Sequence, residues 1–271
     1  MLAGSVLLVL LLMRGERLLP ARRLWPVTLV LAVVGGVGGY GAMFHSPLHT
    51  DAGIAAVLGN TGPLIVIVLA AAFLRERITL VKITALLVGL LGVALIAFAR
   101  EVLARGSSLG IVLPLVAALS ASSESVIVKG GALGEDVLRV TAWQFLGASL
   151  MLGALSLVGE AGTPITWSPT FVAALLVLAI PGSAFGTALW YWLTQRDEVG
   201  RLSLVLFLVP VLGLALGALL FGERVPPTQL LGATLIVAAC VIVALGSPRR
   251  SAVRSVAIGP THDSAKDSGQ A

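Results

Sequence analysis

The chain has little charge, one cysteine and few histidines, and these shortages exclude several classes of protein. Its 271 residues are 58% hydrophobic and only 11% charged, whereas a soluble domain carries roughly 25% charged residues. An ordinary soluble fold is therefore excluded, and nucleic-acid binding has no basic soluble domain to support it. Cys240, the single cysteine, lies in an apolar run, which excludes disulfides and cysteine-rich metal sites. His45 and His49 share one loop and His262 lies near the C-terminus, so no histidine metal site is predicted.

Long apolar segments separated by short charged clusters make up most of the chain, whose mean hydropathy is +1.03. A hydrocarbon core about 30 Å thick takes roughly 20 apolar residues per helix. The run Met1–Met13 is too short to span, and basic residues follow it rather than precede it, so it is the end of a membrane helix and not a signal peptide. The sequence predicts an all-α membrane protein, a polytopic bundle with helices over Leu24–Phe44, Ala52–Leu74, Leu80–Ala99, Leu109–Val128, Val140–Val158, Phe171–Thr194, Leu202–Phe221 and Thr228–Leu245.

Lysine and arginine collect on one side of this arrangement. If the loop that contains Arg14 and Arg23 is cytoplasmic, only Arg100, Arg105 and Arg224 of the 18 basic residues fall on the opposite side. Cytoplasmic loops of membrane proteins carry the excess of lysine and arginine. The protein is therefore predicted to lie in the inner or plasma membrane with its C-terminus in the cytoplasm, and residues 247–271 are predicted to form a disordered cytoplasmic tail.

The sequence repeats itself after 147 positions. This shift aligns two prolines, two Glu-Arg pairs and several glycines, namely Pro63 with Pro210, Glu76-Arg77 with Glu223-Arg224, Gly35 with Gly182 and Gly39 with Gly186. We assign a first repeat to residues 1–99 and a second to residues 105–246. Because each full repeat has an odd number of helices, the two copies are inverted, which is typical of secondary transporters. The first copy is one helix short, so about nine helices are predicted and we expect the natural protein to begin one helix earlier.

The repeated segments resemble a known family. Residues 60–63 (Asn-Thr-Gly-Pro) to 74–77 (Leu-Arg-Glu-Arg), and 208–210 (Leu-Val-Pro) to 221–224 (Phe-Gly-Glu-Arg), each precede a glycine-containing last helix. They are similar to the paired EamA domains of the drug/metabolite transporter superfamily. The resemblance implies two inverted five-helix repeats, no cofactor and a carrier that moves small metabolites or drugs, often outward.

Glu124 is the acidic residue that lies well inside a predicted helix. A carboxyl group at that depth is costly unless it faces a cavity, pairs with another group or is protonated. It could therefore couple a proton to transport, with Ser120 one turn back on the same face as a hydrogen-bonding or cavity-lining group. Alternatively, Glu124 lies near the cytoplasmic interface and is hydrated or paired with Lys129.

Pro63 and Pro210 fall near the middle of their predicted helices, where a proline removes a backbone hydrogen bond and permits a bend. Equivalent bends in two inverted helices suit a gate, although a fixed kink for packing is an equal alternative. Asn60, one turn before Pro63, either contacts substrate or satisfies the freed carbonyl, and we favour the second role.

Aromatic and amide side chains supply the remaining candidates. Tyr40 lies in a glycine-rich helix that a substrate or a neighbouring helix can approach closely, and packing is the preferred reason for those glycines. Gln144 and Trp190 could line a cavity, but their position towards the cytoplasmic ends favours a role in the interfacial aromatic belt.

The repeated Glu76-Arg77 and Glu223-Arg224 pairs border the lipid interface. We predict that each glutamate forms a salt bridge that fixes a helix hairpin, rather than binding a substrate. Replacing Glu223 with Gln should then lower folded yield more than substrate affinity.

These patterns favour a secondary active transporter that exports a small metabolite or drug, driven by its own gradient or by protons. The alternatives are an organic-phosphate or nucleotide-sugar exchanger, which lacks an intramembrane basic cluster, and a non-transporting membrane partner. No paired carboxylates or Ser/His arrangement supports an enzyme, and no Walker loop supports ATP-driven transport. The expected partners are lipid, a small-molecule substrate and protons, and a homodimer stays open.

Overall fold

The protein is a bundle of helices. The computed structural model describes residues 1–49, 55, 58–98, 108–159, 166–222 and 225–246, and each regular element in these ranges is helical. Within them, seven helices are long and apolar enough to cross a membrane, and Leu2–Met13 and Gly62–Leu74 are shorter apolar helices. The predicted fold class, a polytopic helical membrane protein, is confirmed.

The main helical segments follow the predicted succession. Their bounds are α1 (Leu2–Met13), α2 (Trp25–Leu31), η2 (Ala32–Tyr40), α3 (Gly41–His45), α5 (Gly62–Leu74), α6 (Leu80–Phe98), α7 (Ser108–Gly131), α8 (Val137–Gly159), α9 (Pro169–Val177), η5 (Leu178–Phe185), α10 (Gly186–Arg196), α11 (Val199–Val205), α12 (Leu208–Phe221) and α13 (Pro227–Gly246).

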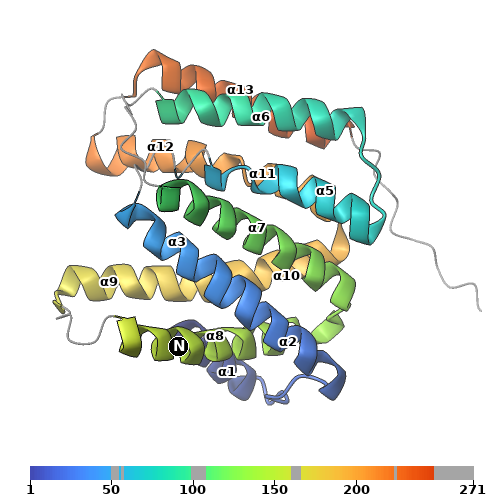
Figure 1. Ribbon diagram of the computed structural model, residues 1–271, viewed down its shortest axis with the longest axis vertical. Coiled ribbons are helices and arrows are strands. Elements are labelled where there is room, and N and C mark those ends of the chain that lie inside the picture. The colour runs from blue at the N-terminus through green and yellow to red at the C-terminus, as the bar shows by residue number, and fades with distance from the viewer. Residues whose placement is uncertain (50–54, 56–57, 99–107, 160–165, 223–224, 247–271) are drawn as a thin grey trace, which may run out of the picture.

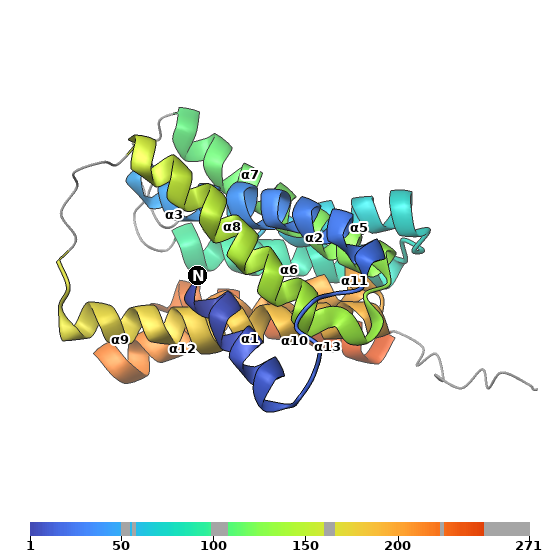
Figure 2. The ribbon, with the colours of Figure 1, turned by 90° about the horizontal axis from the view of Figure 1, so that it is seen from below.

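Helices α6 and α13 pack side by side along one edge of the bundle, whereas α7 lies in its middle (Figure 1). Gly92 and Gly232 allow the backbones of α6 and α13 to meet, because a methyl group on either glycine would lie 2.6 Å from the carbonyl oxygen of the other. Helix α7 contacts α5, η2 and α10, and α8 packs against α1 (Figure 2). The centre of the bundle therefore consists of segments from both repeats.

Both repeated prolines lie in the first turn of a helix rather than in its middle. Pro63 is at the start of α5, after a turn at residues 60–61, and Pro210 is the third residue of α12, after a break between α11 and α12. The predicted interior prolines are thus corrected. A proline in the first helical turn costs no internal hydrogen bond, because the N–H groups there have no intrahelical partner. The discontinuity itself occurs at equivalent places in the two repeats.

Two π-helical segments also occupy equivalent places in the two repeats. Segment η2 continues α2 into α3, and η5 continues α9 into α10. Such segments are rare and often occur at functional sites. The hydroxyl groups of Tyr40, the last residue of η2, and Thr187, at the start of α10, lie 3.4 Å apart, and the two residues are separated by 147 positions. Residues that the repeat relates to each other are therefore in contact.

Glu76 connects the two repeats through its side chain. Its Oε1 accepts a hydrogen bond from the backbone N–H of Val199 at 2.7 Å, and its Oε2 accepts one from Gly200 at 3.1 Å. Lys82 Nζ lies 3.3 Å from the same Oε2 and 3.0 Å from a carboxylate oxygen of Glu198. The salt bridge within the α5–α6 hairpin is present, but its cation is Lys82.

The neighbouring Arg77 contributes its backbone rather than its charge to this network. Its side chain is exposed, whereas its carbonyl oxygen accepts a hydrogen bond from Lys82 Nζ at 3.2 Å. The second pair, Glu223 and Arg224, lies outside the described residues, so its predicted salt bridge stays a prediction.

Candidate functional site

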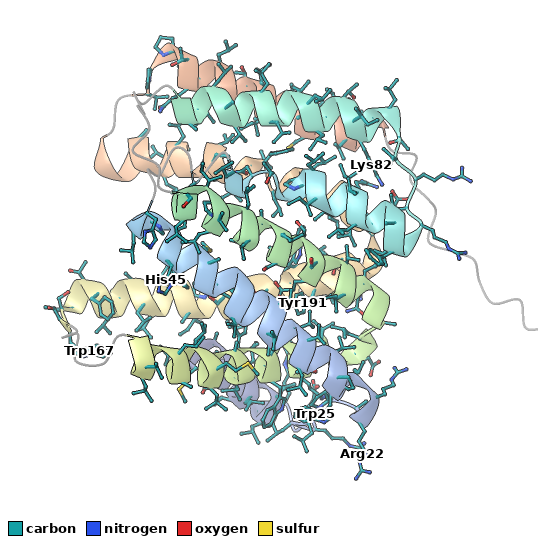
Figure 3. The ribbon with its side chains drawn as sticks, in the orientation of Figure 1. Arg22, Trp25, His45, Lys82, Trp167 and Tyr191 are labelled. Carbon is teal, nitrogen blue, oxygen red and sulfur yellow. The ribbon has the colours of Figure 1, made fainter. Side chains whose placement is uncertain are left out.

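A cavity of about 350 Å³ opens between α5, α7 and the α10 region. Small-molecule sites start at volumes of about 300 Å³, so the cavity suits a small solute. Tyr191, a residue of the cavity wall, lies in the interior of the bundle in Figure 3. One end of the bundle in this view carries Arg22 and Lys82, and the opposite end carries Trp167. The wall consists mainly of small, apolar and hydroxyl-bearing residues: Gly59, Gly62, Val66, Ala118, Ala121, Ser122, Glu124, Ser125, Gly182, Gly186, Thr187, Trp190, Tyr191 and Leu206.

Glu124 supplies the acidic group of this wall, and a glycine on the neighbouring segment makes space for it. A methyl group on Gly35 of η2 would lie only 2.4 Å from the carboxyl carbon of Glu124. Gly38 has the same relation to Ser120, whose hydroxyl oxygen would lie 2.8 Å from an added methyl group. The glycines of η2 therefore let this segment pack directly on the polar face of α7.

Gln144 of α8 and Tyr191 of α10 hold one oxygen of the Glu124 carboxyl group. Gln144 Nε2 lies 2.5 Å from Glu124 Oε1, and the Tyr191 hydroxyl group is hydrogen-bonded to the same oxygen. The Tyr191 hydroxyl also lies 2.5 Å from Gln144 Oε1, which closes a ring of three contacts. Gln144 and Tyr191 are both fully buried. Three helices thus converge on a single carboxyl oxygen.

When Glu124 is ionised, the ring has one proton fewer than its three contacts require. Three contacts require three protons, but the Gln144 amide supplies one to the ring and the Tyr191 hydroxyl supplies one. A neutral Glu124 supplies the third by donating to Tyr191, which then donates to the Gln144 carbonyl. If the Gln144 amide is rotated so that its oxygen and nitrogen exchange places, the directions of donation change, but the ring still needs three protons. The number of satisfied hydrogen bonds therefore changes when Glu124 gains or loses a proton.

Two serines and a tryptophan complete the polar part of the wall. Ser122 Oγ donates to backbone carbonyls, with Ala118 O at 2.6 Å and Gly62 O at 3.0 Å. Ser125 Oγ lies 3.0 Å from Ala121 O and accepts a hydrogen bond from the Trp190 indole N–H at 3.0 Å. The proton of each serine hydroxyl is thus directed to the backbone, which leaves oxygen lone pairs for a ligand.

The structure brings several of the candidate residues together. Glu124 and Trp190 line the cavity, and Gln144 lies directly behind Glu124 rather than at an interface. Ser120 packs against η2 outside the cavity wall, and Tyr40 contacts Thr187 while its ring stacks on Phe44.

Asn60 adjoins the cavity wall in the chain, and Lys129 bonds to the backbone at the end of α10. Asn60 occupies the turn that precedes α5, between two glycines of the wall. Lys129 donates to the backbone carbonyl of Asp197 at 2.9 Å. The alternative pairing of Glu124 with Lys129 is therefore corrected, because Gln144 and Tyr191 are the partners of Glu124.

Four polar residues of the cavity wall were not singled out from the sequence: Tyr191, Thr187, Ser122 and Ser125. Tyr191 stands between two tryptophans, a pattern that favours an interfacial belt, and only the orientation of α10 turns its hydroxyl group towards α7. One signal was available, since Tyr191 is one of only two tyrosines in the chain and a buried acid requires a donor. Thr187 carries a signal too, because the 147-residue shift aligns it with the candidate Tyr40.

Comparisons with known proteins agree with this architecture. The model of the EamA-like transporter family matches residues 1–98 and 108–245. The chain is 30% identical over 210 residues to the uncharacterised transporter YoaV of Bacillus subtilis (strain 168), covering 77% of this chain and 72% of YoaV. It is 28% identical over 236 residues to protein PecM of Dickeya dadantii (strain 3937), covering 86% and 78%.

Two further similarities add to these. The chain is 32% identical over 183 residues to a probable amino-acid metabolite efflux pump of Escherichia coli (strain K12), covering 61% of this chain and 60% of the pump. A crystal structure with 21% identity shares the fold with a TM-score of 0.77, covering 91% of this chain and 86% of the other. The family model matches two ranges that together span most of the chain, and the structure is a bundle of apolar helices around a cavity. The chain therefore belongs to the EamA-like transporter family of multi-pass membrane proteins.

Proposed function

We propose that the protein is a secondary active carrier that exports a small organic metabolite or drug through the central cavity by alternating access, with a proton exchanged at Glu124. The observation that carries this proposal is the ring of Glu124, Gln144 and Tyr191, whose hydrogen bonds depend on one titratable proton. The ring joins α7, α8 and α10, so a change in its proton content acts on the packing of three helices.

The composition of the cavity wall favours this carrier over an exchanger of organic phosphates. No lysine or arginine is present among the residues that line the cavity in the described part of the chain. Phosphate groups are bound mainly by arginine, lysine and backbone N–H groups. The distribution of basic residues further supports an inner-membrane location with a cytoplasmic C-terminus. The efflux pump of Escherichia coli, to which the chain is similar, makes export the preferred direction.

Vesicles that contain the purified full chain provide the test. We expect counterflow of a labelled solute from a panel of amines, amino acids and neutral metabolites, and faster flux when a proton gradient is imposed. Glu124→Gln should abolish the acceleration by the gradient, because the amide cannot exchange a proton. Glu135→Gln is the matched control, since Glu135 is an exposed acid outside the cavity.

Three outcomes separate the alternatives. Acceleration that persists in Glu124→Gln would contradict proton coupling at this residue. Counterflow of organic phosphates alone would favour the exchanger. An absence of flux for every solute, in protein that is correctly folded, would favour a non-transporting membrane partner.

A further inference from the structure

The hydrogen-bonding capacity of the cavity wall is strongly biased towards acceptors. Ser122 and Ser125 direct their protons to backbone carbonyls, and the Trp190 indole N–H is used by Ser125. The Tyr191 hydroxyl proton is used within the ring. The Thr187 hydroxyl group, also in the wall, shares a hydrogen bond with Tyr40 in which either group can donate. What remains for a ligand is therefore mainly a set of oxygen lone pairs, and a ligand that supplies several donors matches it.

The second oxygen of Glu124 is the strongest of these acceptors. Both ring contacts of Glu124 are made by its Oε1, and among the described residues no hydrogen bond reaches its Oε2. Glu124 belongs to the cavity wall. Because Glu124 is only partly buried there, a ligand in the cavity can reach its carboxyl group, of which Oε2 is the oxygen that Gln144 and Tyr191 do not hold.

The segments packed against α7 offer Glu124 little competing charge. Tyr191 of α10 and Tyr40 of η2 are the titratable side chains that face it, and both are neutral in the ordinary pH range. The charged groups on the other neighbouring segments are engaged elsewhere. Arg139 of α8 pairs with Asp136 and Glu16, Arg201 of α11 pairs with Asp197, and His45 of α3 contacts the Gly41 carbonyl.

The charge balance decides which ligands this wall can take. An ionised Glu124 without a cation is costly at this depth, and either a proton or a cationic ligand removes that cost. An anionic ligand would find no basic side chain in the wall and would face the carboxyl group directly. Apolar surface from Val66 and Leu206, together with the Trp190 indole, is available to the uncharged part of a ligand.

We infer that the cavity binds a small organic monocation, an ammonium group carried by a flat apolar body, and that this ammonium group displaces the proton of Glu124. The inference rests on the proposed carrier and names its substrate class. In the exchange, the carboxyl O–H proton leaves to water as the ammonium N–H groups bond to Oε2. Cation binding and proton binding at Glu124 exclude each other.

The test uses three probes with the same apolar body that carry a positive charge, no charge and a negative charge, in that order: 2-phenylethylamine, 2-phenylethanol and 3-phenylpropanoate. Binding to the purified full chain is measured by calorimetry, and proton release is measured in weakly buffered solution. A hydrogen bond to a charged group contributes about 1.5–3 kcal/mol, so the amine should bind about 10- to 100-fold more tightly than the alcohol. The amine should also release about one proton per site, and 3-phenylpropanoate should not bind.

Two variants connect this selectivity to Glu124. Glu124→Gln should lose both the preference for the amine and the proton release, whereas the control Glu135→Gln should keep both. If Glu124→Gln does not fold, the wild-type protein still tests the inference. Protons compete with the amine for Glu124, so the affinity of the wild type for the amine must fall as the pH is lowered. Equal affinity for amine and alcohol, binding of 3-phenylpropanoate, or amine binding without proton release would overturn the inference.

The proposed carrier function and the proposed cation-binding site can be refuted independently. Amine binding with proton release but without flux in vesicles would refute transport and support the site. Proton-driven flux of neutral or anionic solutes alone would support the carrier and refute the cation site.

Discussion

Glu124 and Glu76 are both largely enclosed by the bundle, but their carboxyl groups are held in opposite ways. Glu76 is surrounded by an ammonium group and two backbone N–H donors, and its side chain is only 9% exposed. The carboxyl group of Glu124 contacts two uncharged groups, an amide and a hydroxyl group, and borders the cavity. A carboxylate that pairs with a cation stabilises the contacts around it, whereas one with neutral partners beside a cavity is available to a ligand. The comparison favours a stabilising role for Glu76 and supports the proposed proton exchange at Glu124.

The largest effect is expected from removing Lys82, the cation that pairs with Glu76. Lys82→Met leaves Glu76 and Glu198 without their shared ammonium group, and breaking a buried ion pair costs about 3–5 kcal/mol. We expect a large loss of folded yield and a lower midpoint of thermal unfolding in detergent. An unchanged midpoint would mean that Lys82 does not stabilise the junction of α5, α6 and α11.

A smaller loss of stability is expected from Glu76→Gln. The amide can still accept one backbone hydrogen bond, but the charge that Lys82 requires is lost, at a cost of about 2 kcal/mol. Flux per folded molecule and its pH dependence should match the wild type. A changed pH profile would show that Glu76 takes part in transport, and the comparison would then fail.

Gly35→Ala tests the space that Glu124 occupies. The added methyl group would overlap the carboxyl group, so we expect about 1–2 kcal/mol of overpacking and a clear loss of amine binding. Gly41→Ala is the matched control, because a methyl group there would make only an ordinary contact of 3.5 Å with Leu152. Equal amine binding in both variants would indicate that the Glu124 position is not critical.

Tyr191→Phe should have the smallest effect on stability and a specific effect on function. The aromatic ring of the side chain still fills its buried position, while the two hydrogen bonds that the hydroxyl group makes with Glu124 and Gln144 are lost, together worth about 1 kcal/mol. We expect the pH profile of flux to shift while the thermal midpoint falls only slightly. A shift of the midpoint alone, measured on the same preparation, would assign Tyr191 to packing.

The sequence predicted what depends on single segments, and it failed where several segments meet. Apolar length and charge placement predicted the helices and the membrane class, and the isolated acid pointed to Glu124. The partner of Glu76 was wrong in detail because Lys82 lies one helix further, beyond a turn that sequence reasoning cannot orient. Tyr191 was missed because its contact with Glu124 spans 67 positions, and no local pattern encodes that distance. The prolines were misplaced because the helix breaks that precede them depend on packing.

The contact between Tyr40 and Thr187 has a consequence for motion. The two residues are equivalent under the repeat, so an operation that exchanges the two halves maps this contact onto itself. A contact between residues that the repeat does not relate, such as that of Glu124 with Tyr191, is mapped onto a different pair of residues, and an exchange of conformations between the halves would have to remake it. In the proposed alternating-access cycle, we therefore expect the contact between Tyr40 and Thr187 to be kept in both end states and to act as a pivot.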